Sequence, residues 1–132
     1  GEIDIDISGS SLLLTMDMLI QNNNINRVYK IENYQMSITE RIGHTELYVN
    51  GRFYDSDYGY VDLTTTSVLL IYNYDDYPYS GQIVITGENG IDGGPTKARL
   101  TALSDTQCQV EADTTGDGLY DYDSGPILWT EL

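Results

Sequence analysis

The sequence predicts an all-β fold, a single-domain antiparallel meander that forms a sandwich or barrel of about nine or ten short strands. Apolar and polar residues alternate with a period of two along much of the chain, and no segment shows a convincing helical period. Turn-forming sequences separate these segments at intervals of roughly 8–14 residues, which is typical of such folds. The 132 residues fit one domain that covers residues 1–132.

In the N-terminal half, alternating segments predict four strands. They cover residues 2–8, 12–20, 28–41 and 47–53. A short helix is the alternative for residues 12–20, because Leu and Met are good helix formers. Turns are expected at the three asparagines 22–24, around Gly43, and in the polar segment 55–59.

The C-terminal half predicts six further short strands. They cover residues 60–63, 68–74, 82–86, 97–103, 107–112 and 127–132. The first two are expected to flank a threonine-rich corner. Asn89-Gly90, Asp92-Gly93 and Gly94-Pro95 predict a hairpin connection, because such pairs accept positive φ and end a ladder. All connections are short, so consecutive strands are expected to be neighbours.

The charge of the chain restricts its partners. There are 21 acidic residues against 6 Lys and Arg, a net charge of −15. Nucleic acids and anionic lipids need basic patches, so neither is an expected partner. No apolar run is long enough for an integral membrane span.

The one cysteine, Cys108, lies in phase with Val110 and Ala112. This phase predicts that the thiol is buried and behaves as a small hydrophobic group.

The segment 113–124 is the sharpest chemical signal in the chain. Its spacing of oxygen-bearing residues around Gly118 suits a hard cation such as calcium. The expected ligands are Asp113, Thr115, Asp117, the carbonyl of Leu119, and Asp121. The alternative is a plain hairpin turn, because Asp and Gly make good turns without any metal.

This segment resembles the EF-hand-type Asp-x-Asp-x-Asp-Gly calcium loops of extracellular bacterial domains. Two positions depart from that pattern. Thr115 stands where such loops have Asp or Asn, and Ser124 stands where the helical EF-hand has a bidentate Glu. The resemblance therefore implies a weak site, with a dissociation constant on the order of 10⁻⁴–10⁻³ M.

Tyrosine is unusually frequent, with twelve residues beside one Phe and one Trp. Eight of them lie between Tyr48 and Tyr79, interspersed with aspartates. Exposed tyrosines on one face would stack on a carbohydrate or contact a protein partner. The candidate ligand-binding residues are Tyr58, Tyr60, Tyr74, Tyr77 and Tyr79. The alternative is that tyrosines simply suit half-buried β surfaces.

The segment 80–132 also resembles the C-terminal ends of uncharacterised secreted or lipid-anchored bacterial proteins. The resemblance rests on Ser-Gly-Gln-Ile-Val-Ile-Thr-Gly, Lys-Ala-Arg-Leu-Thr-Ala-Leu, the acidic loop and the closing Leu-Trp-Thr-Glu-Leu. It implies a β-rich exported protein, located outside the cell or in the cell envelope (the periplasm or the surface), with lipid anchoring as an alternative. It implies no activity.

We therefore expect a non-catalytic extracellular or cell-envelope β domain, stabilised by a weak calcium site, whose partner is a carbohydrate or another envelope protein. A carbohydrate-binding module that uses surface tyrosines is the alternative. A hydrolase with a carboxylate pair is a third class, but 21 acids always include some pair at a suitable spacing, so this abundance carries no signal.

Overall fold

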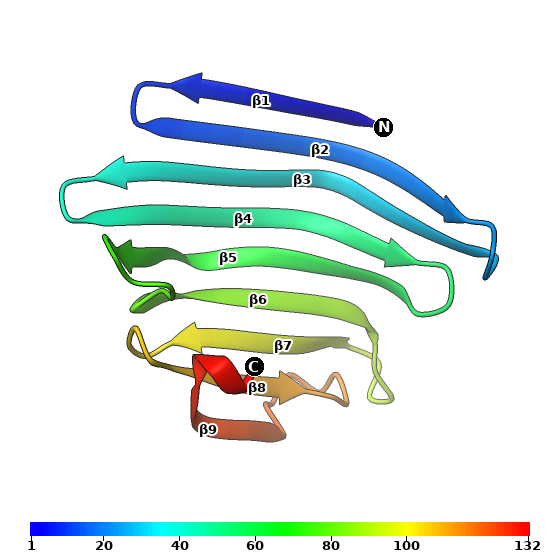
Figure 1. The fold of residues 1–132 in the computed structure, drawn as a ribbon. Helices are drawn as coiled ribbons and strands as arrows, with labels where there is room; N and C mark the ends of the chain where they lie inside the picture. Colours follow the sequence, from blue (N-terminus) through cyan, green and yellow to red (C-terminus); the bar gives the residue numbers. More distant parts are fainter.

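The computed structural model describes all residues 1–132 and contains nine antiparallel strands in one open sheet (Figure 1). The strands lie in the sheet in the order of the sequence. They are β1 (Glu2–Ser8), β2 (Ser11–Asn22), β3 (Arg27–Arg41), β4 (His44–Asp55), β5 (Gly59–Tyr72), β6 (Ser80–Asn89), β7 (Pro95–Ala102), β8 (Gln107–Asp113) and β9 (Tyr122–Leu128). The predicted all-β antiparallel meander is confirmed. The chain contains no helix long and apolar enough to cross a bilayer.

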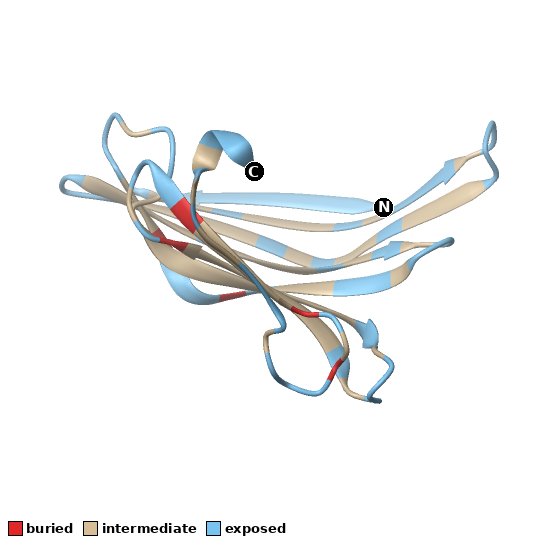
Figure 2. Cartoon of the chain, turned by 90° about the horizontal axis from the view of Figure 1, so that it is seen from below, coloured by how far each residue is buried: buried red, intermediate tan, exposed pale blue.

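The sheet differs in one respect from the expected sandwich or barrel. Both outer strands, β1 and β9, have a neighbour on one side only, so the sheet is a single layer with two free edges. Seen edge-on, this layer is curved and twisted (Figure 2). The right-handed twist of each strand produces such a shape in an open sheet of many strands.

The short helix considered for residues 12–20 is wrong, because this segment lies inside β2. β2 pairs with β3 along its whole length and with β1 from Ser11 to Asp17. Its alternating Leu and Met side chains therefore all reach one face, which a helix would not achieve. Tertiary pairing overrides the helix propensity of these residues.

The two predicted strands at residues 60–63 and 68–74 are one strand, β5. The threonine-rich segment between them stays in the sheet with shifts of register on both sides. The Thr65 hydroxyl donates to the Val49 carbonyl oxygen at 2.7 Å and accepts from the Val49 N–H at 2.8 Å. The side chain thus takes the place of missing ladder hydrogen bonds, so no corner is needed.

The chain end also differs from the prediction. The last strand is β9, which begins at Tyr122, and residues Trp129–Glu131 form a single 3₁₀ turn, η1. The Trp129 indole N–H donates to the Ser104 carbonyl oxygen at 3.0 Å, which fixes the turn to the β7–β8 connection. η1 therefore lies over β8, in front of the sheet in Figure 1.

The register separates an apolar face from a polar face. Ile5, Leu14, Met36 and Val49 are paired across β1–β4 and define the apolar face. The adjacent row on the same strands has Asp4, Thr15, Gln35 and Asn50, and it defines the polar face. Because side chains alternate along a strand, the period-two pattern of the sequence becomes these two surfaces.

The apolar face continues into the C-terminal strands, where its rows contain smaller side chains. The pairings there are Ile83–Leu100–Val110 and Ile85–Ala98–Ala112 across β6–β8. In the middle of the sheet the Tyr34 ring packs directly over Gly51. It also contacts Phe53 edge-on, with ring centroids 6.0 Å apart. An aromatic ring over a strand glycine fills the space that the missing side chain leaves.

Very little of this face is covered. Only six of the 132 residues are buried, and the hydrophobic ones among them are Leu69, Ala102 and Cys108. No buried residue belongs to β1–β4, as the red segments of Figure 2 show. The small core lies near η1, where Tyr77 and Trp129 stack with centroids 5.6 Å apart. The predicted burial of Cys108 is confirmed, because none of its surface is accessible.

Candidate functional site

The acidic loop connects β8 to β9 and is held together by its own backbone. Asp113 is 1% exposed. Its Oδ1 accepts from the Gly116 N–H at 2.7 Å and its Oδ2 from the Gly118 N–H at 2.9 Å. The Asp113 side chain therefore ties the loop together from its first residue to Gly118.

The other two carboxylates of the loop have similar local partners. Asp117 Oδ1 accepts from the Leu119 N–H at 2.8 Å. Asp121 accepts from the backbone N–H and the hydroxyl of Thr114, at 3.0 and 2.5 Å. These Thr114 hydrogen bonds lower the pKa of Asp121 below its usual value, because they favour the charged carboxylate.

A second turn packs against this loop. The Asp92 N–H donates to the Thr115 carbonyl oxygen at 2.9 Å, and the Gly94 N–H donates to the Gly116 carbonyl oxygen at 3.1 Å. A side chain at Gly90, Gly94 or Gly116 would overlap the backbone of the opposite turn. The β6–β7 and β8–β9 connections thus pack against each other as one unit. Glycine is needed at these positions because the two backbones approach closely.

The structure places Asp113 at the end of β8 and Thr115, Asp117, Leu119 and Asp121 in the connection that follows it. It arranges them chiefly for hydrogen bonding within that loop, and no group of three or more His, Cys, Asp or Glu side chains is placed to hold a metal ion. Each carboxylate oxygen that accepts one backbone N–H keeps a second lone pair. Calcium binding by this loop stays a prediction, with a plain turn as the alternative.

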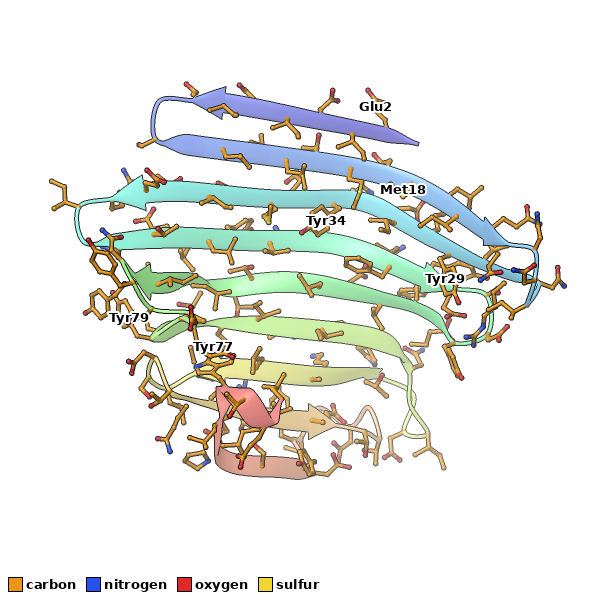
Figure 3. The ribbon with its side chains drawn as sticks, in the orientation of Figure 1. Glu2, Met18, Tyr29, Tyr34, Tyr77 and Tyr79 are labelled. Atoms are coloured by element: carbon orange, nitrogen blue, oxygen red, sulfur yellow. The ribbon has the colours of Figure 1, made fainter.

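The candidate tyrosines do not form one cluster. Tyr58 lies in the turn just before β5 and Tyr60 at the start of this strand, whereas Tyr74, Tyr77 and Tyr79 follow its end. A 14-residue strand such as β5 is about 45 Å long at roughly 3.3 Å per residue. Figure 3 shows Tyr77 and Tyr79 at the end of the sheet opposite Tyr29, which lies at the same end as Tyr58.

Most of these tyrosines have partners within the chain. Tyr79 stacks on Tyr72 with centroids 3.9 Å apart, and Tyr77 stacks on Trp129. The Arg52 guanidinium lies 4.4 Å from the Tyr60 ring centroid and forms a bidentate ion pair with Asp62 at 2.7 Å. Tyr74 is fully exposed, and Tyr58 is 79% exposed. Of the five candidates, these two have the most exposed side chains.

Tyr58 lies at the rim of a hollow in the apolar face. The hollow has a volume of about 330 Å³, and its apolar walls are Ile20, Ile31, Phe53 and Val61. Asp55 is the acidic residue that lines the hollow. The Arg27 guanidinium is 5.0 Å from the Tyr58 centroid and 2.6 Å from Asp57. Concave apolar sites with a few polar groups are the usual places for ligands.

No protein-family profile, curated protein sequence or solved structure matches this chain. The structure itself offers three candidate sites: the acidic loop, the hollow beside Tyr58, and the apolar face. Sequence reasoning identified the loop and named Tyr58, but not the hollow or the open face. The alternation of Ile, Leu and Met was visible in the sequence. That alternation predicts an apolar face, and it contains no information about what covers it.

Proposed function

We propose that this protein is a non-catalytic binding domain of the extracellular space or cell envelope, and that its apolar face is its binding surface. One observation carries the proposal. A nine-stranded sheet leaves one face uncovered over β1–β4, with Ile3, Ile5 and Ile7 at 52%, 61% and 71% exposure. Stable domains bury such a face against a second layer, and monomers rarely expose apolar patches larger than a few hundred Å².

A solvatochromic dye tests this surface. Nile red is expected to bind the native protein in dilute solution with blue-shifted emission, because the apolar face is then free. Met36→Glu places a charge in the middle of the face and should reduce dye binding. Gln35→Glu adds the same charge on the polar face and serves as the matched control. Absence of dye binding from the folded, monomeric protein would refute the proposal.

A weak calcium site in the acidic loop belongs to the same proposal, because exported domains are exposed to millimolar calcium. With ligand at about ten times the dissociation constant, the native state should gain about 1.4 kcal/mol. For a chain of this size the melting temperature should then be higher by about 5 °C in calcium than in EDTA. The Asp117→Ala protein should lose this difference. An equal melting temperature in both solutions would leave the loop as a plain turn.

Carbohydrate binding is the second candidate function, and the exposed Tyr58 ring beside the hollow favours it. A sugar would stack on the ring while its hydroxyls bond to polar groups such as Asp55. Binding of the protein to a glycan array is expected to disappear in Tyr58→Ala. Tyr74→Ala is the control, because this exposed ring lies beyond the far end of β5, away from the hollow. A blank array for the unmodified protein would remove this candidate.

A further inference from the structure

The accessible surface of the chain is too large for a compact monomer. It measures 8311 Å². A folded monomer of 14.8 kDa is expected to expose roughly 7,000 Å² by the usual dependence of area on mass. The surplus is roughly 1,300 Å². It agrees with a single-layer sheet whose apolar face contains no buried residue over β1–β4. The structure therefore has the surplus area that an interface would remove.

We propose that a second copy of this chain covers the apolar face, so that two sheets pack face to face in a homodimer. This inference rests on the proposed function and names the partner of the same surface. Burying the surplus on both copies would remove roughly 2,600 Å², which lies within the range of about 2,000–5,000 Å² for obligate homodimers. In a two-fold dimer the same patch meets itself, so its chemistry must be self-complementary.

The apolar face meets that condition. The rows Ile5–Leu14–Met36–Val49 and Ile7–Leu12–Ile38–Leu47–Leu69 contain only aliphatic and thioether side chains. These two rows therefore offer no side-chain donor or acceptor that a partner would have to satisfy, and a second aliphatic layer completes their packing.

The distribution of charge also selects this mode of association. Packed sheets lie about 10 Å apart, so the polar faces of the two copies would point outward and be separated by more than the Debye length of about 8 Å. Their negative charges would thus be screened from each other.

The free edge of β1 differs from the polar faces in this respect. Glu2, Asp4 and Asp6 form no ion pair, and pairing of β1 with its copy would bring these acids to about 5 Å. Repulsion along this edge favours face-to-face packing over edge-to-edge packing.

Sedimentation equilibrium of the protein over a dilution series tests the inference. The expected mass is twice the 14.8 kDa of the chain, with dissociation on dilution. Met36→Glu should weaken the dimer by at least roughly tenfold, because the new carboxylate would be buried without a partner. Gln35→Glu should change the dissociation constant by less than about twofold, because its site faces solvent. Ile5→Glu is a second variant for the case in which Met36→Glu does not fold, since Ile5 is already 61% exposed in the single chain.

Three outcomes would overturn the inference. One is a monomeric mass at the highest soluble concentration. Another is a dimer that Met36→Glu and Ile5→Glu leave intact although both variants keep a β-type circular-dichroism spectrum. The third is a monomer that carries a lipid or other amphiphile in native mass spectrometry. A monomer that still binds Nile red would leave the proposed function standing, whereas a folded monomer without dye binding would refute both.

Discussion

Gly116→Ala is expected to lower the free energy of unfolding by about 3 kcal/mol. Gly116 is buried and has a φ of +80°, a conformation that costs an alanine about 1–2 kcal/mol. The new Cβ would also overlap the Gly94 carbonyl oxygen on the opposite turn. Relieving that overlap would separate the two connections and break the Gly94–Gly116 backbone hydrogen bond. Overpacking of this kind typically adds about 1–3 kcal/mol.

Gly118→Ala provides the matched control for this prediction. Gly118 has a similar φ of +90°, but nothing lies within 4 Å of the position that its Cβ would occupy. It should therefore show only the conformational cost, about 1–2 kcal/mol. Urea unfolding of both variants, analysed at constant m-value, measures the difference. Equal midpoints for the two variants would show that the turns do not pack as closely as the structure indicates.

Asp113→Ala is expected to destabilise the fold by a similar amount, about 3 kcal/mol, because two backbone donors lose a charged acceptor. These donors are the N–H groups of Gly116 and Gly118. Gly116 is buried, so water cannot readily replace the carboxylate there. The measurement is again urea unfolding, performed in EDTA so that calcium plays no part.

Asp117→Ala separates the structural role of the loop from any role in cation binding. Asp117 is exposed and accepts only one local hydrogen bond. Its removal in EDTA should have a small effect compared with Asp113→Ala. If the two variants were equally stable in EDTA, the internal hydrogen bonds of Asp113 would not hold the loop together. In that case the two aspartates would contribute to stability mainly by binding calcium.

The candidate sites were predictable to different degrees. The acidic loop was visible because its residues are adjacent in sequence, and turn chemistry is local. The grouping of Tyr58 with Tyr74, Tyr77 and Tyr79 was wrong as a spatial cluster. These residues are close in the chain but are separated by the length of β5, because the threonine-rich segment is part of a continuous strand. The hollow beside Tyr58 draws its walls from four strands, so no local pattern could indicate it.

Sequence alone determined that the chain is an antiparallel meander with one apolar and one polar face, because period-two alternation and turn residues act over a few neighbouring positions. It also determined that Cys108 points into the apolar side, since its phase matches Val110 and Ala112. Only the tertiary structure decided that the nine strands remain one open layer and that the buried hydrophobic residues lie on β5, β7 and β8 and not on β1–β4. Alternation fixes which side of a strand is apolar. Whether a second layer from the same chain reaches that side depends on how the whole sheet twists and where its two edges lie.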